Sequence, residues 1–285
     1  MQKIESIQAM QQWARSVQRD GKRIALVPTM GFLHEGHLSL IRLAHEQADR
    51  VVVSLFVNPK QFGPNEDYDR YPRDYARDQQ LLEAEQVDAL FCPSAEEMYT
   101  PGHSVYVEED AVSRVLEGES RPGHFRGVLT VVAKLFLAVQ PDLAVFGRKD
   151  AQQLYLIRKM ARELNFPIAI VAGPTVREPD GLALSSRNAY LAGAAREQAA
   201  TLHRALKEAL RLYREGERNA YRLRKVMMDM VLAASEAEMD YIEIVDTATF
   251  TPVTTVQGPA LALLAVRFGS TRLIDNMELT AEDAP

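Results

Sequence analysis

The sequence has 285 residues, more than the roughly 100 to 200 of a typical domain, so we expect one large and one smaller domain. Its net charge of -6, from 33 basic and 39 acidic residues, repels phosphate backbones and argues against general nucleic-acid binding. The single cysteine, Cys92, excludes an internal disulfide. No apolar run reaches the ~18 to 20 residues that span a bilayer, and the charged start does not fit a secretory signal. We therefore expect a cytoplasmic protein without nucleic-acid or membrane partners.

The first half of the chain alternates between predicted strands and helices. Apolar residues between Ile7 and Val17 recur at helical spacing, and Gly21 follows where a left-handed residue stops a helix. Five short apolar runs, rich in branched side chains and bounded by turn-forming residues, predict buried parallel strands. These runs are 24–27, 51–57, 89–92, 143–146 and 168–171.

Helical patterns lie between these strands, at 37–47, 75–85, 128–139 and 152–164. The third carries one apolar stripe from Val128 to Val139 and ends just before Pro141. Strands and helices that alternate in this way predict right-handed crossovers and a Rossmann-like, doubly wound α/β sheet. Ligands of such folds bind beyond the carboxyl ends of the strands.

The pattern changes after about Thr175. Two amphipathic helices, 196–215 and 220–236, precede strand-like runs at 241–245 and 260–266. The sequence therefore predicts a large domain over residues 1–174 and a smaller α+β domain over residues 175–285, with the boundary close to Gly173-Pro174.

The segment after the first predicted strand has the features of an anion site. It reads Pro-Thr-Met-Gly-Phe-Leu-His-Glu-Gly-His over residues 28–37 and continues into a helix. Gly31 permits a tight turn, Gly36 removes a side chain where a ligand could approach, and the first amides of the helix point toward that ligand. His34 and His37 share one face of the first helical turn, so both can donate hydrogen bonds to phosphate oxygens.

Two other interpretations of these histidines stay open. They could be metal ligands, although no nearby cysteine or carboxylate at metal-ligand spacing supports that. They could also be structural histidines. If a triphosphate binds there, two imidazole donors at a positive helix end stabilise the charge that grows when a carboxylate attacks the α-phosphate.

Blocks from about Val27 to Asn188, together with a closing block at 272–276, resemble the pantothenate synthetases, a branch of the HxGH nucleotidyltransferase superfamily. The HxGH tetrad at 34–37 by itself indicates only the superfamily, and the other blocks make the resemblance specific. The blocks are 28–31 (PTMG), 33–37 (LHEGH), 56–59 (FVNP) with Gln61 and Phe62, 71–73 (YPR), 121–125 (RPGHF) with Gly127 and Val128, 140–142 (QPD), 147–150 (GRKD) with Gln152 and Gln153, 181–188 (GLALSSRN) and 272–276 (RLIDN). Arg148 and Phe32 depart from the common pattern.

The resemblance implies an ATP-dependent ligase with pantoate and β-alanine as its other substrates. The pantoate carboxylate would attack the α-phosphate of ATP, and β-alanine would convert the resulting adenylate to pantothenate and AMP. The large domain would bind nucleotide and pantoate, and the smaller one would be a lid that excludes water from the reactive anhydride. The family also implies a homodimer.

The resemblance assigns ATP contacts to several of these blocks and catalytic roles to His34, His37 and Lys149. The ATP-binding residues are Met30, Gly31, Phe32, Leu33, His34, Glu35, Gly36, His37, Gly147, Arg148, Lys149, Asp150, Val176, Leu184, Ser185, Ser186 and Arg187. On sequence alone, 147–150 could be an exposed charged turn and 184–187 a helix N-cap.

Gln61 and Gln153 carry amides that can donate and accept, which suits a substrate with two hydroxyls and a carboxylate. The family assigns both to pantoate and adds Gln61 to the β-alanine site, and we expect Asn58 and His124 to line it. The acidic residues Asp67, Asp69, Asp74 and Asp78 are most simply a solvated helix entry. Near a triphosphate some of them could hold Mg²⁺ through water, and Asp78 is our predicted Mg²⁺ residue.

Two rival functions remain at this point. A nucleotidyltransferase that moves AMP onto a phosphorylated precursor would share the HxGH motif, but it would need further basic groups for the second phosphate. A regulatory module would bind the nucleotide without turnover.

Overall fold

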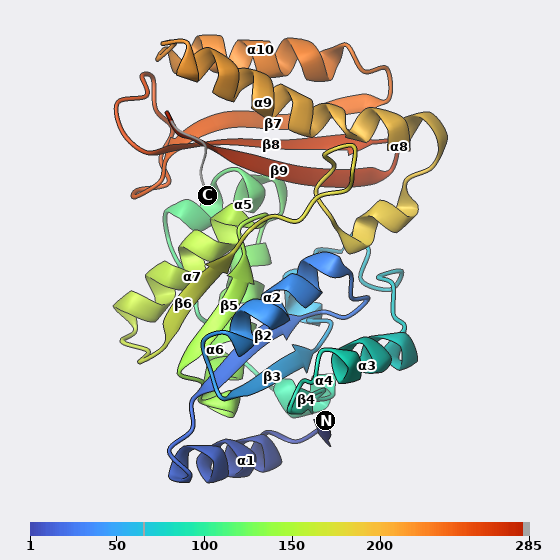
Figure 1. The fold of residues 1–285 in the computed structure, drawn as a ribbon, viewed down its shortest axis with the longest axis vertical. Coiled ribbons are helices and arrows are strands. Elements are labelled where there is room, and N and C mark those ends of the chain that lie inside the picture. Colours follow the sequence, from blue (N-terminus) through green and yellow to red (C-terminus); the bar gives the residue numbers. More distant parts are fainter. Residues whose placement is uncertain (65, 282–285) are drawn as a thin grey trace. The chain divides into compact units, whose positions relative to one another are not determined.

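The computed structural model describes residues 1–64 and 66–281, and these residues divide into two compact units. The first comprises Met1–Arg148 and Gln152–Pro174. The second comprises the chain from Thr175 onward together with Lys149–Ala151, a short segment that follows a strand of the first unit. Figure 1 labels most of the helices and strands of both units.

The first unit is built on a six-stranded parallel sheet in the order β1-β4-β3-β2-β5-β6. The strands are β1 (Gln2–Ile4), β2 (Ile24–Thr29), β3 (Arg50–Leu55), β4 (Ala89–Phe91), β5 (Leu143–Gly147) and β6 (Ala169–Gly173). The predicted doubly wound sheet is confirmed. The edge strand β1 was not predicted, because it has three residues of which only Ile4 is buried.

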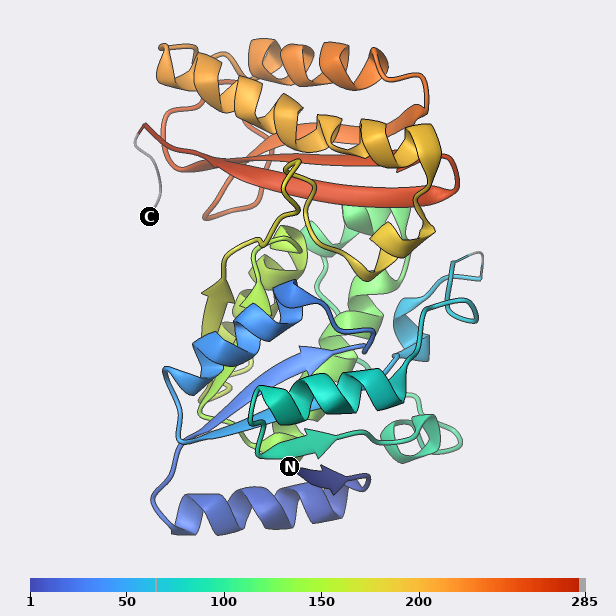
Figure 2. The same ribbon diagram turned by 45° about the vertical axis from the view of Figure 1, so that its right-hand side comes forward.

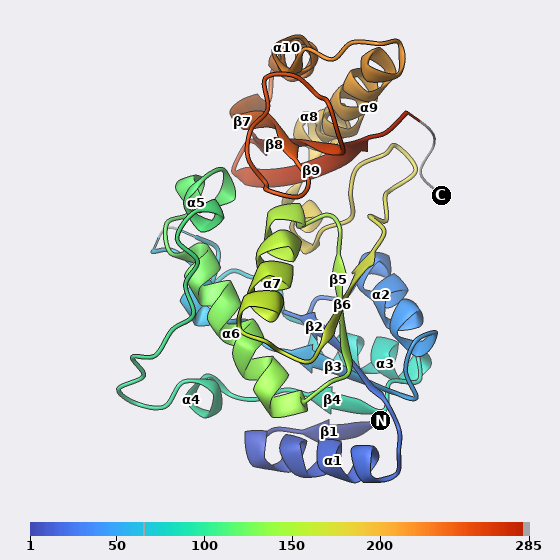
Figure 3. The ribbon, with the colours of Figure 1, turned by 90° about the vertical axis from the view of Figure 1, so that its left-hand side faces the viewer.

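Helices cover both faces of this sheet. They are α1 (Ile7–Arg19), α2 (Glu35–His45), α3 (Tyr75–Ala84), α4 (Ala95–Met98), α5 (Glu117–Ser120), α6 (His124–Val139) and α7 (Ala151–Glu163), with short 3₁₀ turns η1 (Pro59–Gln61) and η2 (Val112–Arg114). Figure 3 shows α2 and α3 on one side of the sheet and α6 and α7 on the other. The apolar stripe predicted from Val128 to Val139 is buried as expected. Burial of such side chains contributes about 1.5–3 kcal/mol each.

The sheet order places the site. β2 lies between β3 and β5, so the direction in which the strands are added reverses between β2 and β5. In a doubly wound sheet, the carboxyl ends of the strands at this switch point bind ligands. The turn with His34 and His37 follows β2, and Gly147 ends β5. The predicted anion site therefore lies where the topology favours a ligand.

The second unit contains a three-stranded antiparallel sheet in the order β7-β8-β9. Its elements are η3 (Ser186–Tyr190), α8 (Gly193–Ala199), α9 (Thr201–Arg214), α10 (Ala220–Leu232), β7 (Ala237–Asp246), β8 (Ala260–Phe268) and β9 (Thr271–Leu279). Helices α9 and α10 lie along one face of this sheet (Figure 2), and apolar residues of both helices and of β8 form the core between them.

Two predictions for this unit need correction. The helix predicted over 196–215 is divided at Ala200 into α8 and α9, because the apolar stripe continues across a one-residue turn and periodicity does not reveal it. Strand β9 was not predicted, because Asp275 and Asn276 are buried polar residues that interrupt the apolar pattern. Within residues 1–64 and 66–281, no helix is both long enough and apolar enough to cross a membrane.

Candidate active site

The turn between β2 and α2 is held by Asp78 of helix α3. Gly31 and Phe32 have positive φ angles of 85° and 50°. The two carboxylate oxygens of Asp78 accept hydrogen bonds from the backbone amides of Phe32 and Leu33, each at 2.7 Å. A Cβ atom on Gly31 would lie 3.1 Å from Asp78 Oδ2, so both the backbone angle and the close approach favour glycine there.

Asp78 is almost fully buried, and burial raises the pKa of its carboxyl above the ordinary value. The amides of Leu33 and Phe32 act in the opposite direction because they stabilise the carboxylate. Among the residues that the structure describes, no cluster of three or more His, Cys, Asp or Glu side chains could hold a metal ion. The geometry gives Asp78 a role in fixing the turn, and its expected role at Mg²⁺ stays a prediction.

His34 and His37 form a reciprocal cap at the start of α2. Nδ1 of His34 accepts the amide of Gly36 at 3.2 Å, and Nδ1 of His37 accepts the amide of His34 at 3.3 Å. The two ring centroids are 4.1 Å apart. A ring nitrogen that accepts an amide proton carries none itself, so each neutral ring is protonated on Nε2. Both imidazoles therefore carry an Nε2–H donor, as anion binding requires.

Two backbone amides that we expected to point toward a ligand are hydrogen-bonded to groups of the turn itself. The amide of Gly36 binds the His34 ring, and the amide of His37 binds the His34 carbonyl at 2.7 Å. These two amides are engaged within the turn. The imidazole Nε2–H groups remain the predicted phosphate donors of this turn.

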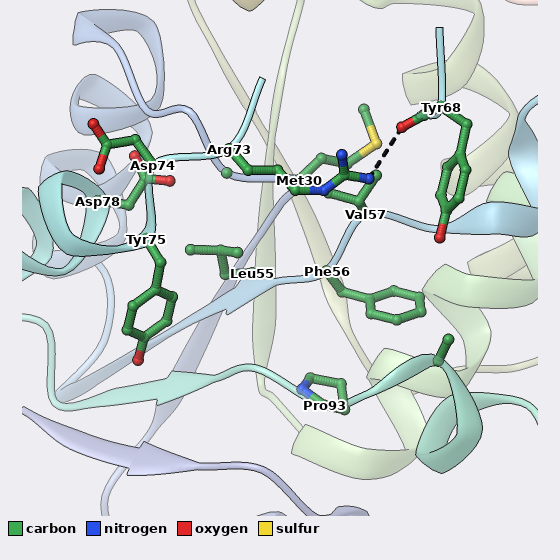
Figure 4. Close-up of a pocket in the computed structure, with 12 residues that line it drawn as sticks. Met30, Leu55, Phe56, Val57, Tyr68, Arg73, Asp74, Tyr75, Asp78 and Pro93 are labelled. Atoms are coloured by element: carbon green, nitrogen blue, oxygen red, sulfur yellow. Dashed lines mark hydrogen bonds between the residues drawn. The ribbon is translucent and has the colours of Figure 1, made fainter. Parts of the chain in front are cut away.

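A pocket of about 310 Å³ adjoins this turn (Figure 4). Its wall includes Met30 and Gly31 from the turn and Asp78 from α3. The rest of the lining is mostly apolar, with polar groups at Arg73, whose guanidinium donates to the Tyr68 carbonyl at 3.0 Å, and at Asp74. The pocket lies on the Met30 and Gly31 side of the turn, and His34 and His37 are not among the residues that line it.

Gln61 is held from several directions by neighbours in the first unit. Its side-chain oxygen Oε1 accepts from Asn58 Nδ2 at 3.0 Å, and its Nε2 lies 3.2 Å from Met30 Sδ. Its backbone carbonyl accepts from Nδ1 of His124 at 2.9 Å. Since a carbonyl only accepts, His124 carries its proton on Nδ1. Its Nε2 accepts a hydrogen bond from Nη1 of Arg121 at 3.0 Å. His124 thus holds the backbone of Gln61 in place.

Two further residues of the same sequence block complete this arrangement. The Arg121 guanidinium forms a bidentate pair with Glu66, with both bonds at 2.7 Å. A Cβ atom on Gly127 would lie 2.2 Å from the Lys60 carbonyl oxygen, so only glycine lets α6 approach η1 this closely. The block at 121–127 therefore fixes the position of Gln61. Sequence spacing gave no sign of these contacts.

Gln153 lies in the first turn of α7, as predicted, and its neighbour Gln152 is buried. The Gln152 side chain accepts from the Glu117 amide at 3.1 Å and donates to the carbonyls of Val112 and Val115 at 2.7 and 2.8 Å. Gln152 is thus a structural residue, and it ties α7 to the segment that precedes α6.

The predicted ATP residues from Lys149 onward belong to the second unit, whereas Gly147 and Arg148 belong to the first. The Lys149 backbone carbonyl accepts from Asn276 Nδ2 at 2.8 Å. In the predicted phosphate loop, the Leu184 amide bonds to the Val176 carbonyl at 3.0 Å. Ser185 is the N-cap of η3 and accepts the Arg187 amide at 3.3 Å, which confirms the N-cap interpretation for this residue.

A parallel α/β sheet with paired imidazole donors after β2, at its switch point, defines a protein of the HxGH nucleotidyltransferase type. The model of the pantoate–β-alanine ligase family matches residues 2–278, and the chain belongs to this family. It is 53% identical to the pantothenate synthetase of Heliobacterium modesticaldum over 97% of this chain and 99% of that protein. It is 52% identical to that of Moorella thermoacetica over 99% and 100% of the two chains.

Solved structures of this family are similar to the chain over nearly its whole length. A pantothenate synthetase from Thermus thermophilus has a TM-score of 0.93 at 44% identity, and the match covers 98% of this chain and 99% of that one. A pantoate–β-alanine ligase from Francisella tularensis, complexed with β-γ ATP and β-alanine, has a TM-score of 0.80 at 36% identity and covers 97% of both chains.

Proposed function

We propose that the chain condenses (R)-pantoate with β-alanine in an ATP-dependent, AMP-forming ligase reaction. In the first step the pantoate carboxylate attacks the α-phosphate of ATP, which gives pantoyl adenylate and releases pyrophosphate. In the second step the β-alanine amine attacks the acyl carbon, loses a proton and releases AMP, which leaves pantothenate. Membership of the pantoate–β-alanine ligase family supports the reaction. The observation that carries it is the reciprocal cap of His34 and His37, whose Nδ1 atoms accept backbone amides, so that each neutral ring has its proton on Nε2.

Each imidazole binds the phosphate chain of ATP in this proposal. Negative charge grows on the leaving pyrophosphate as the carboxylate attacks, and donors that are already oriented stabilise it without reorganisation. The reciprocal cap at the start of α2 supports this role, since it fixes both ring tautomers. The Lys149 ammonium neutralises phosphoryl charge, and Ser185, Ser186 and Arg187 bind further phosphate oxygens.

Gln61 and Gln153 bind the hydroxyl and carboxylate oxygens of pantoate, and Gln61 also serves the β-alanine site. The contacts of Gln61 with Asn58 and His124 support this assignment. His124 fixes the backbone carbonyl of Gln61 and Asn58 binds its side-chain oxygen, so the side-chain NH₂ group points in one direction. Asn58 acts through Gln61.

Mg²⁺ enters with ATP as a complex, since this ion keeps much of its water shell and prefers phosphate oxygens. The described side chains do not form a dedicated cage for it, and the carboxylate of Asp78 already accepts two amides. The proposed steps therefore use the side chains of the protein and the substrates themselves.

The second unit acts as a lid that keeps water from the acyl adenylate, in a cytoplasmic homodimer. Mixed anhydrides hydrolyse readily, which is the physical reason for such a lid. The family resemblance is the support for the dimer.

The test supplies ATP, Mg²⁺, pantoate and β-alanine and measures the nucleotide formed. We expect AMP, pyrophosphate and pantothenate in equal amounts. AMP transfer to a phosphorylated precursor, with no product from pantoate, would identify the rival nucleotidyltransferase. ATP binding without release of pyrophosphate would identify a regulatory module.

A further inference from the structure

We propose that Tyr99 is a positioning residue for the acid substrate: through Asn58, its hydroxyl orients the Gln61 side chain so that the Gln61 NH₂ group is presented to that substrate. This inference rests on the proposed function, in which Gln61 binds pantoate and β-alanine. Tyr99 follows helix α4 and lies 41 residues from Asn58 in the sequence, outside every block that resembles the family.

The orientation of the Asn58 amide is set by two backbone groups. Its Oδ1 accepts the amide of Lys60 at 3.2 Å, and its Nδ2 donates to the carbonyl of Gly127 at 3.1 Å. A backbone N–H only donates and a backbone carbonyl only accepts, so a flipped Asn58 would lose both bonds. Asn58 is also buried, so water does not replace them readily.

The two positions of Asn58 that remain are used by side chains. The Tyr99 hydroxyl donates to Oδ1 at 2.8 Å, and Nδ2 donates its second proton to Gln61 Oε1 at 3.0 Å. All four hydrogen-bonding positions of Asn58 are thus occupied by the protein. The fixed amide of Asn58 requires an acceptor from Gln61, so the carbonyl oxygen of Gln61 faces Asn58. The NH₂ group of Gln61 therefore faces the opposite way, toward Met30 in the turn before His34.

Tyr99 is well anchored for this role. Its ring packs edge-on against His103 at a centroid distance of 4.9 Å and lies 6.3 Å from the ring of Phe56. The ammonium groups of Lys60 and Lys134 each lie 5.9 Å from its centroid. Burial raises the pKa of the Tyr99 hydroxyl above its ordinary value, so the group stays a donor throughout the neutral range.

The chemical consequence concerns substrate choice. An NH₂ group donates to the carboxylate and hydroxyl oxygens of pantoate or β-alanine, whereas a flipped amide would present an oxygen and repel a carboxylate. Loss of the Tyr99 hydroxyl removes one of the bonds that hold this orientation. Loss of the Tyr99 hydroxyl should therefore weaken the binding of the acid substrate and leave the binding of ATP unchanged.

The test variant is Tyr99→Phe, which keeps the ring. We expect the KM for pantoate to rise about 5- to 10-fold, the range for one lost hydrogen bond, with the KM for ATP unchanged. The matched control is Tyr106→Phe, because Tyr106 packs against the same histidine, with ring centroids 5.1 Å apart, while the hydroxyl that binds Asn58 belongs to Tyr99. We expect the KM values of this control to equal those of the unmodified protein.

A second variant tests the orientation directly and does not depend on how Tyr99→Phe folds. Gln61→Glu replaces the NH₂ group by an oxygen, so it should raise the KM for pantoate at least as much as Gln61→Ala. A Gln61→Glu protein that keeps its affinity for pantoate would show that the carbonyl faces the substrate and would overturn the inference.

A double-mutant cycle separates positioning from general packing. Tyr99→Phe should have no further effect on the KM for pantoate in a Gln61→Ala background. An equal effect in both backgrounds, or equal changes in the KM values for pantoate and ATP, would refute the role of Tyr99. Failure of the proposed function is distinct, because the unmodified protein would then form no AMP from pantoate.

Discussion

The side-chain amide of Asn276, in strand β9, donates a hydrogen bond to the backbone carbonyl of Lys149 at 2.8 Å. The preceding residue, Asp275, forms a bidentate pair with Arg177, with distances of 2.6 and 2.9 Å. Arg177 also donates to the carbonyl of Gly181 at 3.0 Å. Two adjacent residues of β9 thus hold both the Lys149 segment and the base of the predicted phosphate loop, so Lys149 is anchored in the second unit although it follows a strand of the first.

Substitution of Asn276 should impair the chemical step. Asn276→Asp keeps the shape but replaces the donor by an oxygen that repels the Lys149 carbonyl, and we expect the adenylation rate to fall about tenfold. Pyrophosphate release in single-turnover experiments measures this rate. The control is Asp240→Asn, which removes the partner of Arg272 in the same strand and should leave the rate unchanged. If both variants lose activity equally, the effect comes from β9 in general.

Removal of either imidazole donor should slow adenylation more than the substitution of Asn276 does. We expect His34→Ala and His37→Ala to reduce the rate of pyrophosphate release by about 10²-fold or more, as for other lost transition-state donors. His45→Ala is the control, because this ring lies at the far end of the same helix and bonds to the Glu85 carbonyl at 3.0 Å. Near-normal rates in both test variants would exclude a catalytic role for the pair.

Substitution of Asp78 distinguishes a structural role from a metal site. In Asp78→Asn the side-chain NH₂ would face one of the two amide donors of Phe32 and Leu33, so the turn should loosen and the adenylation rate should fall about tenfold. The loss should be the same at every Mg²⁺ concentration. Asp69→Asn, an exposed change in the same acidic stretch, should have no effect. Recovery of Asp78→Asn at high Mg²⁺ would instead assign a metal role to Asp78.

His203 makes the stability of the protein pH-dependent. Burial first, and then the nearby Arg177, lower the pKa of this half-buried ring below its ordinary value of 6.5. The folded protein therefore binds the proton less readily than the unfolded chain does. The contribution of His203 to the free energy of unfolding is fully present above the ordinary pKa of the ring and is lost as the pH falls below that pKa.

Denaturant unfolding from about pH 8 to about pH 5 measures this contribution. We expect the denaturant concentration at the unfolding midpoint to decrease as the pH is lowered in the unmodified protein. It should decrease less in His203→Gln, whose side chain cannot be protonated. The same pH slope in both proteins would show that other groups are responsible.

Local patterns in the chain were sufficient to predict most elements and the family to which the chain belongs. Helix α6 carries an apolar stripe that its periodicity reveals, and strands β2 to β6 were located as short apolar runs. The HxGH tetrad lies within 34–37, where the spacing of residues along one helical turn places both imidazoles on the same face. These features depend on neighbours in the chain, which a sequence displays directly.

The contacts that orient these groups depend instead on how distant segments meet in the folded chain. Asp78 binds the amide of Leu33 across 45 residues, Tyr99 binds Asn58 across 41, and Asn276 binds Lys149 across 127. Each bond joins segments that meet because of strand order and helix packing, and polar side chains of this kind carry no periodic signal. Periodicity reports which face of an element is buried, whereas the partner of a buried polar atom is set by the path of the whole chain.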